Sequence, residues 1–130
     1  MEQDITIYLA KAAESLQTAE SEFANGRYNS CANRCYYACF QVAIAALLAE
    51  GIRARGQWSH AFVQGQFVGV FINQRHLYDT QLRRVLSDNQ QVRDKADYRP
   101  ELVTATPASR ALRHTRTFVA AVRQRGGVSS

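Results

Sequence analysis

The sequence predicts an all-α protein, an antiparallel bundle of about five helices in a single domain. Its 130 residues are enough for one domain with one hydrophobic core. The only two prolines, Pro100 and Pro107, lie in the last third of the chain, and a long proline-free stretch favours helices over a turn-rich β fold. Apolar residues recur at spacings of three and four along most of the chain, which is the period of helices buried on one face.

The first predicted helix runs from about Ile5 to Asn25, with Asp4 as its N-terminal cap. Its apolar residues recur at helical spacing and would face the core: Ile5, Tyr8, Leu9, Ala12, Leu16, Ala19 and Phe23. Asn25-Gly26 ends this helix, because glycine readily adopts the left-handed conformation found after helix C-termini.

The second predicted helix runs from about Tyr28 to Glu50 and stops at Gly51. One apolar stripe follows it, formed by Cys31, Cys35, Cys39, Val42 and Ala46. Zinc sites usually combine one closely spaced pair of cysteines with a second pair of Cys or His, and the sequence has no second pair. The three cysteines are therefore predicted to pack in the core, and no metal or cofactor is expected.

The third predicted helix runs from His60 to about Ile72, after a loop from Ile52 to Trp58 and with Ser59 as its cap. Its apolar face consists of Phe62, Val63, Phe67, Val70 and Phe71. Gly65 and Gly69 lie four residues apart within it, and we expect them to permit close packing against a neighbour.

The fourth predicted helix starts near Asp79-Thr80 and continues to about Asp97. Its apolar positions are sparse: Leu82, Val85, Leu86, Val92 and Ala96. Much of this helix is therefore expected to face water, a partner or a functional site.

The fifth predicted helix follows Pro100, with Thr106 as its cap and Pro107 in its first turn. Its inner edge would consist of Leu112, Thr115, Val119 and Val122, and Gly126 would end it. Residues 1–125 are thus predicted to form the domain, and residues 126–130 a flexible C-terminal tail.

The charge balance is basic, with a formal net charge of +5, and 14 of the 16 basic residues are arginines. The planar arginine side chain binds phosphate in a bidentate way, so this composition fits RNA or nucleotide binding; it also fits a protein that uses arginine for solubility. Free thiols and the lack of a signal peptide predict a cytoplasmic protein. The longest apolar run, residues 42–49, is too short to span a membrane.

Two segments are rich in reactive or charged side chains. The first is Asn33-Arg34-Cys35-Tyr36-Tyr37-Ala38-Cys39-Phe40. If the cysteines face the core, Arg34, Tyr37 and Gln41 share another face of the helix. An arginine beside a phenol can bind phosphate or stack on a base. Alternatively, Arg34 holds a carboxylate of a neighbouring helix and the tyrosines only pack.

The second segment is Arg93-Asp94-Lys95-Ala96-Asp97-Tyr98. Arg93 and Asp97 are four residues apart, so they are expected to form an ion pair within the helix. Tyr98 and Arg99 would then leave the helix. The alternative interpretation is a salt-bridged helix end with no other role.

Together these segments resemble the HEPN family, in its small stand-alone type. The resemblance rests on YNSCANRCYYACFQVAIAALLAEG, on the histidine that opens the next helix, and on the later RDKADY. It implies a helical homodimer, often encoded beside a minimal nucleotidyltransferase in toxin–antitoxin or defence modules. Many members are metal-independent ribonucleases with an Arg-x4-6-His motif, and two protomers bring their motifs together.

Arg93 occupies the arginine position of that motif, but the residue five positions later is Tyr98. A tyrosine has an ordinary pKa near 10 and is a poor general base at neutral pH. His60 matches the family's histidine after the second helix and is a candidate acid or base. The literal Arg-x4-His from Arg55 to His60 spans a loop, and we interpret it as a chance match.

The resemblance therefore implies two sets of site residues. The candidate catalytic residues are Arg93, Tyr98 and His60, and the candidate binding residues are Asn33, Arg34, Tyr37 and Asp97. Three functions stay open: a toxin-type protein that binds or cuts RNA, a non-catalytic helical dimer that binds a nucleotide or docks a nucleotidyltransferase, and a dimer in which these residues are purely structural.

Overall fold

The computed structural model describes residues 2–126, which form a helical bundle without a β-strand. Its five α-helices are α1 (Glu2–Ala24), α2 (Tyr28–Ala49), α3 (His60–Gln66), α4 (Val85–Tyr98) and α5 (Ala105–Arg125). The predicted fold class and helix number are therefore confirmed. No helix in the described part of the chain is long and apolar enough to cross a membrane.

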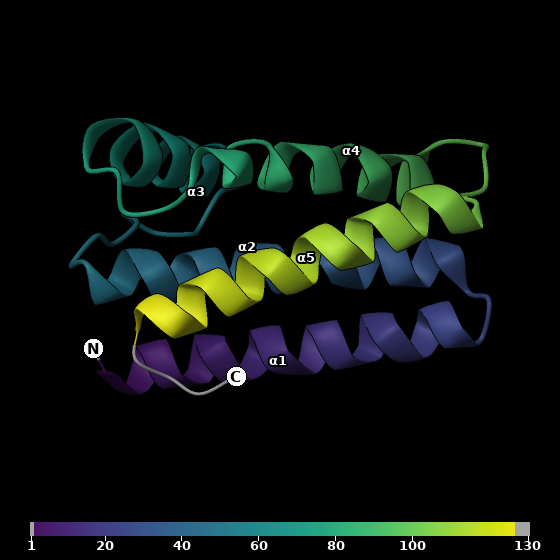
Figure 1. Ribbon diagram of the computed structural model, residues 1–130, viewed down its shortest axis with the longest axis horizontal. Coiled ribbons are helices and arrows are strands. Elements are labelled where there is room, and N and C mark those ends of the chain that lie inside the picture. The colour runs from purple at the N-terminus through teal and green to yellow at the C-terminus, as the bar shows by residue number, and fades with distance from the viewer. Residues whose placement is uncertain (1, 127–130) are drawn as a thin grey trace.

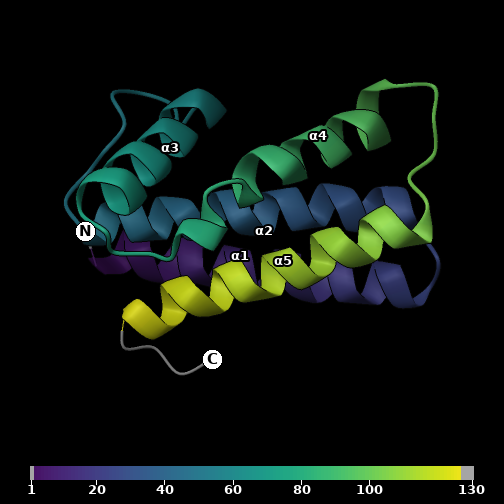
Figure 2. The same ribbon diagram turned by 45° about the horizontal axis from the view of Figure 1, so that its top comes forward.

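The second helix is the centre of the bundle. Figure 1 shows α1 and α5 running along α2, with α4 on its remaining side, and α1, α4 and α5 all contact α2. The run Val42–Leu48 of α2 is buried on every side. Figure 2 shows that α3 and the segment after it cover the C-terminal end of α2. This arrangement explains why apolar and small residues fill α2 so densely.

The predicted cysteine stripe packs in the core. Cys31, Cys35 and Cys39 are fully buried and free. The predicted inner edge of the last helix is buried too, at Leu112, Thr115, Val119 and Val122.

The ends of the first two helices differ little from the prediction. α1 begins at Glu2, so Asp4 is not its cap; the Asp4 carboxylate instead forms an ion pair with Arg53, at 2.9 Å. Gly26 follows α1 with φ +73° and Gly51 follows α2 with φ +77°. Gly26 thus has the left-handed conformation that the sequence predicted, and Gly51, where the second helix was predicted to stop, has it too.

The third predicted helix is present but changes its winding. The Ser59 hydroxyl accepts a hydrogen bond from the Phe62 amide at 3.1 Å, as expected of a cap. After Gln66 the chain continues as a π-helix, η1 (Phe67–Gln74), which buries aromatic side chains in the core. The expected close packing at Gly65 and Gly69 is wrong, because a β-carbon at either position would meet no atom within 4 Å.

The fourth and fifth helices start elsewhere than predicted. Asp79 caps only a short 3-10 turn, η2 (Thr80–Leu82), where its carboxylate accepts a hydrogen bond from the Gln81 amide at 2.8 Å. The α4 helix begins five residues after that turn starts and ends at Tyr98. The α5 helix begins at Ala105, so Thr106 is already helical, although Pro107 lies in the first turn as predicted. Residues 127–130 of the predicted tail lie outside the described residues.

Candidate functional site

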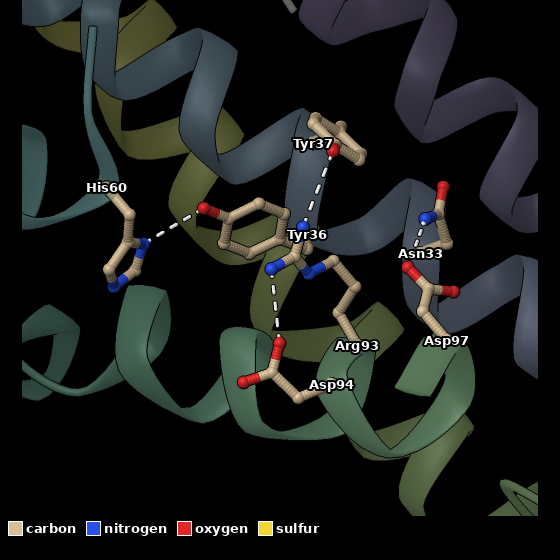
Figure 3. Close-up of polar contacts among 7 residues, drawn as sticks. All are labelled: Asn33, Tyr36, Tyr37, His60, Arg93, Asp94 and Asp97. Carbon is tan, nitrogen blue, oxygen red and sulfur yellow. Dashed lines mark hydrogen bonds and ion pairs between the residues drawn. The ribbon is translucent and has the colours of Figure 1, made fainter. Parts of the chain in front are cut away.

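Most of the predicted site residues meet at the seam between α2 and α4. Figure 3 shows side chains from α2, from the start of α3 and from α4 pointing toward one another. We call this group the Arg93 cluster; it comprises Asn33, Arg34, Tyr36, Tyr37, His60, Arg93, Asp94, Asp97 and Tyr98. The α2 members lie beside the cysteine stripe, on the side of the helix that turns toward α4.

Arg93 is the centre of the cluster. Its side chain is only 15% exposed. One terminal nitrogen donates to the Asp94 carboxylate at 3.1 Å, and the other donates to the Tyr37 hydroxyl at 3.4 Å. The guanidinium lies over the Tyr36 ring, 4.5 Å from its centroid, in a cation–π contact.

The charge of Arg93 is stabilised by these contacts. Burial lowers the pKa of the guanidinium. The hydrogen bond to Asp94 and the neighbouring Tyr36 and Tyr37 together raise this pKa by more than burial lowers it, so the net change is upward. Arg93 therefore keeps its positive charge at every physiological pH.

Tyr36 connects His60 to Arg93. A hydrogen bond of 2.9 Å joins the Tyr36 hydroxyl and His60 Nδ1, while the ring of Tyr36 faces Arg93 (Figure 3). Burial raises the pKa of the Tyr36 phenol, against the opposing effect of Arg93. His60 thus reaches Arg93 through one aromatic side chain.

Two atoms of the cluster are buried and lack a hydrogen-bond partner within residues 2–126. They are His60 Nε2 and Arg93 Nε. A buried polar atom without a partner costs roughly 1–3 kcal/mol of stability. The cluster therefore contains polar groups that the folded chain does not satisfy by itself.

A second link between α2 and α4 runs through Asn33. Its side-chain amide donates to the Asp97 carboxylate at 2.9 Å, and its oxygen accepts from Arg34 at 2.9 and 2.7 Å. The expected ion pair between Arg93 and Asp97 is therefore wrong, because Arg93 contacts Asp94 and Asp97 turns to α2. The alternative in which Arg34 holds a carboxylate is also wrong, since Asn33 binds the carboxylate.

The remaining predicted residues differ in where they lie and in how exposed they are. Arg34 lies over the Tyr37 ring at 5.0 Å, as their helical spacing predicted. Gln41 turns away to α1, where its side-chain amide lies 2.7 Å from the Ser15 hydroxyl. Tyr98 is the last residue of α4 and is 73% exposed, with its ring 5.7 Å from the Arg93 guanidinium.

Sequence reasoning missed two members of the cluster, Tyr36 and Asp94. The signal for Tyr36 was present, because both tyrosines belong to the Asn-Arg-x-Tyr-Tyr pattern. For Asp94 no signal was available, since adjacent residues on a helix do not usually face each other.

A hollow of about 340 Å³ lies beside the Asn33–Asp97 link. All of its lining residues are polar or charged: Thr18, Glu22, Asn29, Ser30, Asn33, Arg34 and Asp97. Small-molecule sites start at roughly 300 Å³, so the hollow has the size for one nucleotide unit. Arginine can bind phosphate there, and the carboxylates can accept hydrogen bonds from a ribose hydroxyl or a base amino group.

The seam therefore combines positive charge with aromatic rings. Arg34 and Arg93 share the Tyr37 ring, and Tyr98 adds an exposed ring beside them. Such combinations hold nucleic acid by phosphate contacts and base stacking. Among residues 2–126 there is no group of three or more His, Cys, Asp or Glu side chains placed to hold a metal ion.

Comparison with known proteins identifies relatives of the whole domain. A family model described as "HEPN domain" matches residues 5–125. A curated protein from Methanocaldococcus jannaschii is 28% identical over 117 residues, which cover 90% of this chain and 84% of that protein. That relative is named a "putative toxin".

Proposed function

This chain belongs to the HEPN domain family, and from that premise we propose that it is a toxin-type protein that binds RNA at the Arg93 cluster. The name of the Methanocaldococcus jannaschii relative supports the toxin part of the proposal. One observation supports the RNA part: two arginines share one tyrosine ring beside the exposed Tyr98, at the edge of a hollow the size of a nucleotide.

Each part of the cluster has a role in this proposal. Arg34 receives a phosphate, because no carboxylate of residues 2–126 forms an ion pair with it. Arg93 adds its positive charge to that of Arg34, which strengthens the attraction for the phosphate, and its contacts hold the tyrosine rings in place. Tyr98 offers its open ring face to a base, which requires an unpaired nucleotide.

RNA cleavage is a second candidate activity, favoured by the position of His60. A hydrogen bond joins His60 Nδ1 to the Tyr36 hydroxyl, and the Tyr36 ring contacts Arg93, so a proton-transfer group and a charge-stabilising group lie on either side of one side chain. In this scheme the 2′-oxygen of the RNA attacks the phosphorus and the bond to the 5′-oxygen breaks. Arg93 stabilises negative charge on the phosphate, while His60, through the Tyr36 hydroxyl, takes the proton of the 2′-hydroxyl or supplies one to the leaving oxygen. No metal ion takes part.

Fluorescence anisotropy with a labelled single-stranded RNA tests the proposed binding. We expect Arg34→Gln to weaken binding about tenfold or more, through the loss of one charged hydrogen bond to the phosphate. Arg93→Gln should also weaken binding, because it removes the second positive charge and the contacts that hold Tyr36 and Tyr37 in place. Arg75→Gln is the matched control, because Arg75 pairs with Glu50 at the other end of α2 and lies outside the cluster. Equal affinity of the wild type, Arg93→Gln and Arg75→Gln would contradict the proposal.

Incubation of the same RNA in EDTA tests cleavage. If the second candidate is correct, the wild type shortens the RNA, whereas His60→Gln binds it and leaves it intact. Intact RNA in the wild-type sample would restrict the function to binding.

Family membership and the cysteines support further parts of the proposal. The family suggests a homodimer and a minimal nucleotidyltransferase as partner, and co-expression with the neighbouring gene product would test the latter. The three free thiols suit a reducing cytoplasm, where disulfides are rare.

A further inference from the structure

A second pocket with basic and aromatic side chains lies at the other end of α2 from the Asn33–Asp97 link. It has a volume of about 330 Å³. The first part of α1, the last turn of α2 and the loop 52–58 form it, and Figures 1 and 2 show these segments together at one end of the bundle. Its lining consists of Asp4, Ile7, Tyr8, Lys11, Leu48, Arg53, Ala54, Gly56 and Trp58. We call it the Trp58 pocket; none of its residues belongs to the Arg93 cluster.

The Trp58 pocket offers positive charge to a ligand. Lys11 is exposed, and no carboxylate of residues 2–126 forms an ion pair with it. One terminal nitrogen of Arg53 donates to the Asp4 carboxylate at 2.9 Å, and its other nitrogens have no hydrogen-bond partner in the described part of the chain. The lining thus sets two cations against one carboxylate, and both cations can donate to a phosphate.

Aromatic side chains lie beside these cations. Tyr8 and Trp58 are both partly buried, and the Lys11 ammonium lies 5.6 Å from the centroid of the Tyr8 ring. The Trp58 ring packs against Phe62, with their centroids 6.1 Å apart, which helps to fix its position. Cations beside aromatic rings bind single-stranded nucleic acid through phosphate contacts and base stacking. The pocket therefore repeats the combination of groups found at Arg34 and Tyr37.

One face of α2 leads from Arg34 to the Trp58 pocket. Tyr37, Gln41 and Leu48 follow Arg34 by three, seven and fourteen residues, spacings that return to the same side of a helix. Figure 3 looks onto this face, with α1 on one side of α2 and α4 on the other. The Gln41 side-chain amide lies 3.1 Å from the Lys11 carbonyl oxygen, so Lys11 adjoins this face about two turns beyond Arg34.

The two sites are within reach of one short strand. Arg34 and Leu48 are about 21 Å apart along the helix axis, at about 1.5 Å per residue. Phosphates of one stacked strand are about 3.4 Å apart along its axis, so roughly seven nucleotides span this distance. Building on the function proposed for the Arg93 cluster, we propose that the Trp58 pocket is a second subsite for the same single-stranded RNA, which runs along this face of α2.

The pocket residues have separate roles at this subsite. Lys11 and Arg53 bind phosphates of the strand, and the free face of the Trp58 ring stacks on a base. These contacts are independent of base identity, because every base has a stacking face and every nucleotide a phosphate. The subsite therefore adds affinity for longer strands and leaves any sequence preference to the Arg93 cluster.

Fluorescence of Trp58 tests the proposal directly, because Trp58 is the single tryptophan of the chain. A base stacked on an indole quenches its emission. An unpaired RNA of about 12 nucleotides, long enough to span both sites, should quench Trp58 over the concentration range in which anisotropy shows binding. Adenosine monophosphate at the same concentrations should leave the emission unchanged, because a single nucleotide lacks the contacts at Arg34.

Two variants of the pocket test its contribution to affinity. Lys11→Gln should weaken binding of this RNA about fivefold and reduce the slope of log affinity against log salt concentration by about 0.7, the loss of one phosphate contact. Trp58→Leu should weaken binding about fivefold or more, through the loss of one stacked base. Arg113→Gln is the matched control, because it removes one charge from an exposed position of α5, which lies behind α2 in Figure 3. Its affinity should stay within about twofold of wild type.

Melting temperatures show whether the variants are folded. RNA binding without quenching of Trp58, equal quenching by adenosine monophosphate, or wild-type affinity in folded Lys11→Gln and Trp58→Leu would each overturn the second subsite. In those cases weak binding by Arg34→Gln would still support the function proposed for the Arg93 cluster. Wild-type affinity in Arg34→Gln would instead contradict that function, and a wild type that binds no RNA would overturn both.

Discussion

The two sides of α2 differ in how their burial affects the stability of the fold. One side is the cysteine stripe, which is fully buried: Cys31 and Cys35 pack against apolar neighbours, and Cys39 also contacts Thr115 and Asn89. The other side carries Tyr36, 4% exposed, and turns to Arg93, beside which buried polar atoms lack partners. Among residues 2–126, two unsatisfied atoms, His60 Nε2 and Arg93 Nε, lie on the second side, whereas the first side has one, Asn89 Oδ1 beside Cys39. Each such atom costs roughly 1–3 kcal/mol of stability. Where a fold accepts such a cost, a functional role is the usual reason.

The largest expected effect concerns the cysteine side, and it depends on pH. Burial raises the pKa of the Cys39 thiol from 9.0 to about 12. The unfolded chain loses this proton near pH 9 while the folded chain keeps it, so stability is complete below pH 9 and is lost as the pH rises toward 12. A shift of this size is worth on the order of 4 kcal/mol.

Urea unfolding in reducing buffer between pH 8 and pH 11 measures this loss. In Cys39→Ala the loss should be smaller than in the wild type, because the titrating group is gone. Tyr78, whose pKa burial raises to about 12, accounts for part of the remaining loss above pH 10. If the free energy of unfolding falls equally with pH in the wild type and in Cys39→Ala, the Cys39 thiol does not contribute to the loss and the prediction is wrong.

A smaller effect is expected from removing apolar volume at the centre of α2. Leu47 is fully buried, and Leu47→Ala should lower the free energy of unfolding by about 3 kcal/mol, the lost transfer energy plus a cavity. The RNA affinity of the folded protein should not change, since Leu47 lies outside the Arg93 cluster. Leu102→Ala is the matched control, because Leu102 is 75% exposed and its loss should cost less than about 0.5 kcal/mol.

The same contrast explains what the sequence could predict. Periodicity identified the cysteine stripe and the inner edge of α5, because apolar burial repeats with the helical turn. Helix starts were predicted less well: Asp4 and Thr106 have the residue types of caps, yet both lie inside helices. Local cap preferences are worth only about 1 kcal/mol, and tertiary packing easily outweighs them.

The sequence predicted which residues belong to the Arg93 cluster better than it predicted which of them contact each other. The motif indicated Asn33, Arg34 and Arg93, but spacing within one helix suggested the wrong partner for Arg93. Asp97 bonds to Asn33, 64 positions away in the sequence, and no local pattern indicates such a contact. Side-chain pairs between helices depend on how the helices cross, which periodicity does not determine.

The smallest expected effect separates two hydroxyl groups on the cluster side. Tyr36→Phe leaves His60 Nδ1 without its hydrogen bond and should cost about 1 kcal/mol of stability, more than Tyr37→Phe, whose hydroxyl makes only a long contact of 3.4 Å with Arg93. The ring of Tyr36 stays over Arg93 in Tyr36→Phe, so RNA binding measured by anisotropy should remain within about twofold of wild type. If the wild type cuts RNA as proposed, Tyr36→Phe should lose this activity, because the proposed proton path from His60 runs through the missing hydroxyl. Weak RNA binding by Tyr36→Phe would mean that the hydroxyl itself helps to hold RNA, and undiminished cleavage would remove Tyr36 from the proton path.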